Sequence, residues 1–212
     1  VTGKKVRLLS WQSNGRSGLE TVVVDDFPEV YEVFTTDQVI SRELFLSGEF
    51  DLKKLQRAHK ILFKRYGHVG KLLVDVGANL GSICIPAVKR GFFERAIAIE
   101  ANPRTAQLLR SNTQRNELED CISILELAAG DYTTTEVQLF DDDFNLGASH
   151  VQDSARGSKT IPTQPLDQMV SHREDVGLLF MDLEGYEGVA LKGASNLMER
   201  GVPIALEFSP KL

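Results

Sequence analysis

The sequence predicts an α/β fold built on a doubly wound, mainly parallel sheet. From residue 71 onward, short apolar runs alternate with segments of helical periodicity, and a glycine-containing turn follows the first of these runs. Such alternation is typical of parallel strands that are buried on both faces and joined by crossover helices. In this architecture a ligand is expected outside the carboxyl ends of the strands.

The composition is that of an ordinary globular protein, with 42% hydrophobic and 25% charged residues in a chain of 212. The net charge is −6, and the densest basic stretch, 53–65, is interpreted as the solvated face of an amphipathic helix. From this acidic balance we expect no nucleic-acid partner. No apolar run is long enough to cross a bilayer, so no membrane partner is expected either. Cys84 and Cys121 lie in apolar runs and predict free thiols in a cytoplasmic protein.

The first third of the chain is predicted to differ from the rest. Strands are expected over 5–9 and 21–24, and a helix is expected to begin after a capping Asp51. We therefore expect an N-terminal extension, residues 1–70, packed on a core formed by residues 71–212.

The core contains the alternating pattern itself. Its expected strands lie at 72–76, 96–99, 121–127, 137–140, 178–181 and 202–206. Its expected helices lie at 82–89, 102–117, where Asn102 and Pro103 form the start, and 186–200. The polar stretch 141–159 is predicted to be a mobile flap over the site, from which Asn145 and His150 reach the cleft.

The turn after the first core strand is the most informative segment. It contains Asp75, Gly77, Ala78, Asn79 and Gly81. The G-x-x-x-G spacing differs from the G-x-G-x-x-G of dinucleotide sites, and an acid stands two residues before the first glycine. A carboxylate there would repel a pyrophosphate and attract an ammonium or sulfonium group, both of which S-adenosylmethionine carries. An ordinary strand-to-helix turn with a capping Asp is the alternative.

Acids also follow the second and third expected strands. Glu100 ends the second strand about 20 residues beyond the turn, where a carboxylate can accept hydrogen bonds from ribose hydroxyls. After the third strand, the small residues Ala129 and Gly130 would leave room for an adenine ring. Asp131 could accept a hydrogen bond from the adenine amino group, although a Gly-Asp turn is common without a ligand.

A further group of acids follows the strand expected at 178–181. Asp182 is the first candidate for a catalytic base because it ends that strand at the cleft, Glu184 is the second, and His150 is the third. Acids that complement the dipole of the following helix are the alternative explanation, which suits Glu184 better than Asp182. The consecutive acids 141–143 are interpreted as a solvated loop, and no metal site is expected.

Taken together, these segments resemble the FkbM family of methyltransferases from about residue 71 to residue 208. The resemblance rests on the segments 74–81, 100–103, 145–147 and 182–187, of which the last, an Asp-x-Glu-Gly-x-Glu box, is the most specific. It implies a class I Rossmann-like fold, S-adenosylmethionine as the methyl donor, and a hydroxyl acceptor on a sugar or natural product. The implied cofactor residues are Asp75, Gly77, Asn79, Gly81 and Glu100, and we also expect Ala78 and Ala101 beside them to contact the cofactor. Ala101 stands where the family frequently has proline.

The class I fold normally ends in two more strands, which form an antiparallel hairpin at one edge. The chain reaches Leu212 just after the fifth core strand, so these two strands are expected to be missing or replaced.

The sequence thus predicts an O-methyltransferase acting on a small molecule or glycan. Two alternatives stay open: a nicotinamide-dependent oxidoreductase, which the G-x-x-x-G spacing disfavours, and a non-catalytic cofactor-binding domain.

Overall fold

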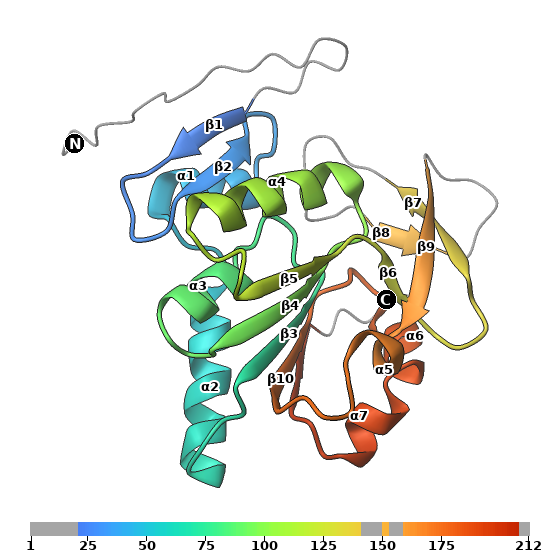
Figure 1. Cartoon of the computed structure of the whole chain (residues 1–212). Coiled ribbons are helices and arrows are strands. Elements are labelled where there is room, and N and C mark those ends of the chain that lie inside the picture. The colour runs from blue at the N-terminus through green and yellow to red at the C-terminus, as the bar shows by residue number, and fades with distance from the viewer. Residues whose placement is uncertain (1–20, 141–149, 153–158, 208–212) are drawn as a thin grey trace.

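The protein folds around a central parallel sheet, seen edge-on in Figure 1. This computed structural model describes residues 21–140, 150–152 and 159–207. The strand order is β11-β10-β3-β4-β5, and every neighbouring pair is parallel. The strands are β3 (Leu72–Val76), β4 (Arg95–Ile99), β5 (Ile122–Leu125), β10 (Val176–Met181) and β11 (Ile204–Leu206). The direction of winding reverses between β3 and β10, which places the switch point at their carboxyl ends.

Helices cover both faces of this sheet because successive strand residues point to opposite sides. In β3, Leu73 joins the core under α3 (Cys84–Lys89) and α4 (Pro103–Arg115). Its neighbours Leu72 and Val74 join the opposite core, under α5 (Leu166–Met169), α6 (Glu187–Lys192) and α7 (Ser195–Glu199). The predicted doubly wound α/β fold is therefore confirmed. No helix in the described part of the chain has the length and apolar character that spanning a bilayer requires.

Residues ahead of the sheet pack on the α3–α4 face. They form the antiparallel pair β1 (Thr21–Val24) and β2 (Tyr31–Phe34), followed by α1 (Ile40–Ser47) and α2 (Leu52–Tyr66). Tyr31, Leu44 and Leu55 are buried in the same apolar cluster as Leu73 of β3. The segment 21–66 and the sheet thus share one hydrophobic core.

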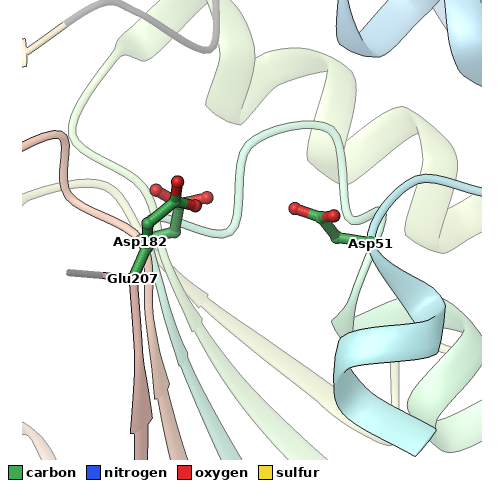
Figure 2. A group of neighbouring side chains, drawn as sticks. All are labelled: Asp51, Asp182 and Glu207. Carbon is green, nitrogen blue, oxygen red and sulfur yellow. The ribbon is translucent and has the colours of Figure 1, made fainter. Parts of the chain in front are cut away.

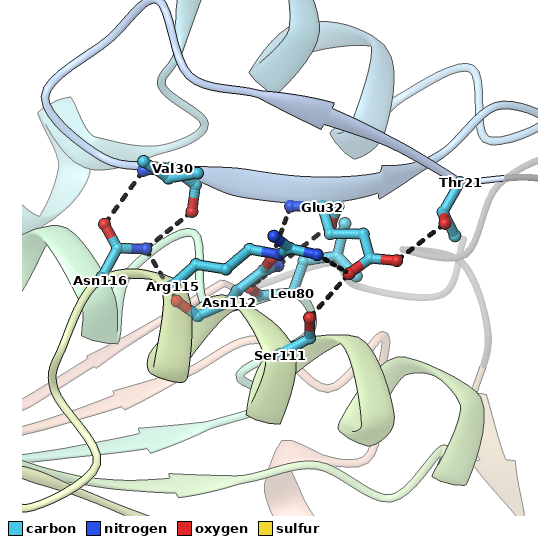
Figure 3. Close-up of polar contacts among 8 residues, drawn as sticks. All are labelled: Thr21, Val30, Glu32, Leu80, Ser111, Asn112, Arg115 and Asn116. Carbon is cyan, nitrogen blue, oxygen red and sulfur yellow. Dashed lines mark hydrogen bonds and ion pairs between the residues drawn. The ribbon is translucent and has the colours of Figure 1, made fainter. Parts of the chain in front are cut away.

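Asn112 of α4 and Asn116, the residue that follows this helix, fasten β2 and the residue before it to this core (Figure 3). The amide oxygen of Asn112 accepts a hydrogen bond from Glu32 N, and its Nδ2 donates to Glu32 O at 3.1 Å and to Leu80 O at 3.0 Å. One turn later, Asn116 accepts from Val30 N at 3.0 Å and donates to Val30 O at 2.7 Å. Asn112 therefore satisfies backbone groups of β2, and Asn116 satisfies those of Val30, the residue before this strand.

Substituting Asn112 with Ala should destabilise the fold. The side chain is fully buried, and its loss leaves backbone groups of Glu32 and Leu80 without these partners. An unsatisfied buried polar group costs about 1–3 kcal/mol, so we expect the free energy of unfolding in urea to fall by about 2–4 kcal/mol. The matched control is Ser111→Ala, which removes one partly buried hydrogen bond to Glu32 and should cost about 1 kcal/mol or less. Equal losses in the two variants would contradict the anchoring role.

A second sheet packs beside the carboxyl ends of the first (Figure 1). Its order is β6-β9-β7-β8, formed by β6 (Ala128–Gly130), β7 (Glu136–Phe140), β8 (His150–Gln152) and β9 (Lys159–Pro165). The sequence predicts a single strand over 121–127. In the structure this strand, β5, ends at Leu125, and the chain then forms β6, which pairs with β9 in the second sheet. The predicted flap includes β8, which pairs with β7. The flap residues 141–149 and 153–158, which include Asn145, lie outside the described residues.

Three further predictions need correction or restriction. Asp51 occupies the N-cap position of α2 as predicted, but its backbone is left-handed (φ 55°) and its side chain makes no cap hydrogen bond. The helix predicted over 186–200 is broken into α6 and α7 near Gly193, where a β-carbon would lie 2.1 Å from the carbonyl oxygen of Gly130. The strand predicted over 5–9 lies outside the described residues.

Candidate functional site

The site lies where β3, β4 and β10 end. Gly77 N and Ala78 N both donate to Ile99 O, and Asp182 N donates to Val76 O at 3.0 Å. Gly77 has φ +85°, and a β-carbon on it would lie 2.0 Å from the carbonyl oxygen of Asp182. The glycine thus lets the turn after β3 lie directly against the end of β10.

Two adjoining pockets open at this point, and they share Gly77, Asn79, Asp182 and Glu184. The first lies on the β4 and β6 side and is partly apolar; its other principal lining residues are Glu100, Ala101, Asn102, Leu127, Ala128, Ala129, Leu139, Val151 and Tyr186. The second lies between the end of β3 and the start of α2 and is rich in charged groups; it is also lined by Phe50, Asp51, Lys54, Asp75, Ser82, Ile83 and Glu207. One elongated ligand could extend from the first pocket into the second.

Glu100 is held rigidly at the end of β4. One carboxylate oxygen accepts from Asn79 N and the other from Asn102 N, both at 2.8 Å. Asn102 in turn caps α4, with its side chain accepting from Arg104 N, as the sequence predicts. Burial raises the pKa of Glu100 to about 7. Each oxygen has a further lone pair, so the carboxylate can still accept two hydroxyl donors from the pocket.

Asp75 is the most deeply buried acid of the second pocket, with 1% of its surface exposed. Its Oδ2 accepts from Cys84 N at 3.1 Å. Burial raises the pKa of Asp75 to about 7, and the charges of Asp182 and Glu100 act in the same direction. A ligand cation next to this carboxyl would favour its ionised form.

Three other predicted cofactor residues do not line either pocket. Ala78 is buried in the hydrophobic core, and Gly81 lies against Ile85. The carboxylate of Asp131 accepts from Thr133 N and Thr134 N at 2.8 Å, and these hydrogen bonds lower the pKa of Asp131 to about 2. Asp131 thus stabilises its own turn, which is the alternative that a Gly-Asp sequence leaves open.

The candidate bases lie at the junction of the pockets. Asp182 and Glu184 line both pockets. Glu187, which follows them, accepts from Leu183 N at 2.9 Å and so stabilises the turn before α6. The backbone of His150 lies in β8, and its side chain is outside the described part of the structure.

A cluster of three carboxylates closes the second pocket, formed by Asp51, Asp182 and Glu207, whose oxygens lie within 4.8 Å of one another (Figure 2). Lys54 Nζ lies 2.8 Å from Asp51 Oδ2 and 3.2 Å from Glu207 Oε2. This ammonium already offsets part of the negative charge, so we assign no metal ion. The pKa of Asp182 is raised to about 6, chiefly by burial; the nearby Glu207 and Glu184 act in the same direction, and Lys54 opposes them.

Residues with a left-handed backbone gather in the second pocket. Asp51 (φ 55°), Asn79 (φ 49°) and Glu184 (φ 51°) all line it. Among the described non-glycine residues only Glu117 shares this conformation. Such strain costs of order 1–3 kcal/mol per residue and tends to cluster at ligand sites, so it supports a functional role for this pocket.

Comparison with known proteins gives one family match. The family described as the methyltransferase FkbM domain matches residues 75–211. A curated relative from Saccharomyces cerevisiae, a tRNA (guanine(37)-N(1))-methyltransferase, is 26% identical over 130 residues, which are 58% of this chain and 24% of that protein.

The chain also matches solved structures at low sequence identity. The FkbM methyltransferase of Methylobacillus flagellatus KT is 23% identical, with a TM-score of 0.46 over 70% of this chain and 36% of that one. An RNA methyltransferase of Salinibacter ruber, solved with S-adenosyl-L-homocysteine, is 20% identical, with a TM-score of 0.28 over 34% and 48% of the two chains. The chain spans about a quarter of the curated relative and about a third of the first of these structures.

The relative that methylates tRNA corrects one prediction. The acidic net charge was expected to exclude a nucleic-acid partner, and this exclusion is wrong, because a protein similar to this chain acts on tRNA. The net charge of −6 is a sum over the whole chain and does not describe the charge of any one surface.

Proposed function

Because the chain belongs to the FkbM methyltransferase family, we propose that it transfers a methyl group from S-adenosylmethionine to a hydroxyl of a small molecule or glycan. The observation that carries the proposal is the pair of adjoining pockets, one partly apolar and one acidic, which share Gly77, Asn79, Asp182 and Glu184. A cofactor with an adenosine at one end and an amino acid at the other has matching chemistry.

The residues fit this cofactor in three ways. Glu100 has lone pairs for two ribose hydroxyls, and the small Ala101, Ala128 and Ala129 leave room for a flat ring. Asp75 supplies a buried carboxyl for the ammonium group. When bound, the cofactor supplies an electrophilic methyl group with a good leaving group.

Asp182 is proposed to accept the proton of the acceptor hydroxyl. Its carboxyl lies at the junction of the two pockets, so an acceptor in the second pocket could reach both Asp182 and the methyl group. Its pKa of about 6 leaves most of the carboxyl ionised at neutral pH and able to act as a general base. Glu184, which lines the same junction, is the second candidate, and His150 is the third.

The proposal is tested first by calorimetry and then by an acceptor screen. S-adenosylhomocysteine should bind the protein, whereas binding of NADH alone would favour the oxidoreductase. Sugars, natural-product alcohols and tRNA are then offered with a methyl donor labelled in the methyl group, and products are identified by mass spectrometry. Cofactor binding without any labelled product across the screen would favour the non-catalytic alternative.

RNA methylation is the second candidate, and the tRNA methyltransferase relative favours it. The tRNA arm of the screen separates the two functions. A methyl label on a nucleobase of the tRNA would show that the chain methylates RNA and would contradict the proposal of a hydroxyl acceptor.

Substituting Glu100 with Ala should weaken cofactor binding. Hydrogen bonds to a charged group contribute about 1.5–3 kcal/mol, so we expect the Kd for S-adenosylhomocysteine to rise about 10- to 150-fold by calorimetry. Asp131→Ala is the matched control, because this acid also follows a core strand but lies outside both pockets, and its Kd should stay unchanged. If the Kd rose more in Asp131→Ala than in Glu100→Ala, the first pocket would not be the site that binds the ribose.

A further inference from the structure

The helix α2 carries a concentration of positive charge that the proposed methyl transfer does not use. Six of the chain's 24 lysines and arginines lie within its 15 residues, and it contains no acid. Within the described ranges, Lys54 is the only one of the six that forms ion pairs, and its partners are Asp51 and Glu207. In a chain with net charge −6, this is a strong local reversal of sign.

Four of these cations form one stripe. Lys53, Arg57, Lys60 and Lys64 follow the spacing i, i+4, i+7 and i+11, which places them on one face of the helix. All four are exposed, and none forms an ion pair with a residue in the described ranges. At 1.5 Å per residue the stripe is about 16 Å long.

Large apolar side chains flank the stripe. Ile61 is 55% exposed and Phe63 58% exposed, and at about 100° per residue they lie on opposite sides of the stripe, roughly 70–90° from its centre. The buried face of α2, with Leu52 and Leu55, packs on the protein core, so the stripe points away from it.

We propose that the α2 stripe, Lys53, Arg57, Lys60 and Lys64, is a docking surface for a single strand of nucleic acid. A row one side chain wide complements a linear polyanion, whose phosphates repeat along a line. Phe63 flanks the stripe, and its exposed ring lies where it could stack on bases. A flat anionic bilayer fits less well, because Ile61 and Phe63 would point sideways when the stripe faced it. The inference is independent of the proposed methyl transfer.

The test measures binding of a fluorescent 20-nucleotide single-stranded RNA by anisotropy, without cofactor, over a range of salt concentrations. Four phosphate contacts predict a slope of log K against log salt of about −3. The variant Arg57→Glu/Lys60→Glu should bind at least about tenfold more weakly at low salt, with a slope about half as steep. Lys159→Glu/Arg173→Glu is the matched control, because it changes the charge equally at exposed positions outside α2 and should bind within about twofold of the unaltered protein.

Three results would overturn the proposal: no RNA binding, equal weakening in the two double variants, or binding to phosphatidylserine vesicles without binding to RNA. The neutral variant Arg57→Gln/Lys60→Gln separates loss of charge from misfolding. It should weaken binding with an unchanged melting temperature, and binding equal to that of the unaltered protein would count against the stripe.

Discussion

Replacing Asp182 with Asn is expected to lower the turnover of methyl transfer by about 10²-fold or more, the usual scale for a general base. Asn has nearly the same shape but cannot take the acceptor's proton. The affinity for S-adenosylmethionine should stay nearly unchanged, because Asp75 and Glu100 are the acids proposed to hold the cofactor. Turnover is measured with saturating acceptor and labelled donor, and affinity by calorimetry.

The matched control is Glu207→Gln, which neutralises a neighbouring acid of the same cluster. Its turnover should stay within a few-fold. Because Glu207 raises the pKa of Asp182, the pH at which turnover is half-maximal should move down in this variant. In the unaltered protein, turnover should rise with pH through about 6, since only ionised Asp182 accepts a proton. If Asp182→Asn instead lost cofactor binding and kept its turnover, Asp182 would belong to the cofactor site and the base would lie elsewhere.

Replacing Asp75 with Asn is expected to have two opposite effects. Cofactor affinity should fall by about 100-fold, because the ligand's ammonium loses a buried hydrogen-bonded counter-charge. The protein without ligand should become more stable at pH 8, by up to about 4 kcal/mol, since a pKa unit corresponds to 1.36 kcal/mol. The amide oxygen of Asn can still accept the hydrogen bond from Cys84 N.

The sign of the stability effect follows from proton linkage. The pKa of Asp75 rises from 3.8 to about 7 on folding, so between these pH values the folded state binds more protons than the unfolded state. The contribution of Asp75 to the free energy of unfolding therefore falls progressively as pH rises through this window. In the Asp75→Asn variant this fall is absent. Urea unfolding of both proteins at pH 5 and pH 8 measures it. A variant that is less stable at pH 8 than the unaltered protein would show that the Asp75 carboxylate stabilises the fold.

Much of the central sheet could be predicted from sequence because its signals are local. The strand over 72–76 is observed with those bounds, since its apolar run is continuous and ends at a glycine turn. Asn102 and Pro103 begin α4 as predicted, because a cap needs only residues within one turn of helix. Asp182 and Glu100 were located by the rule that ligands lie at the carboxyl ends of strands.

Other features depend on contacts between distant segments. Asp51, Lys54 and Glu207 meet across more than 150 residues of sequence, and no local motif indicates that α2 reaches the cleft. Only the position of Glu207 just after the last strand could have identified it. The second sheet was missed for a similar reason, because β6 is three small residues whose partner, β9, lies beyond the polar stretch.

The second pocket is built from two parts of the chain, which has a consequence for how such an enzyme could evolve. Asp75, proposed to hold the cofactor, belongs to the sheet, whereas Phe50, Asp51 and Lys54, which line the same pocket, come from the chain ahead of the sheet. Under the proposed function, substitutions in this segment could change the acceptor that the enzyme methylates, while the residues of the sheet that bind the cofactor stay the same. New specificities would then arise mainly by change of a segment that supplies neither Asp75 nor Glu100, the acids proposed to hold the methyl donor.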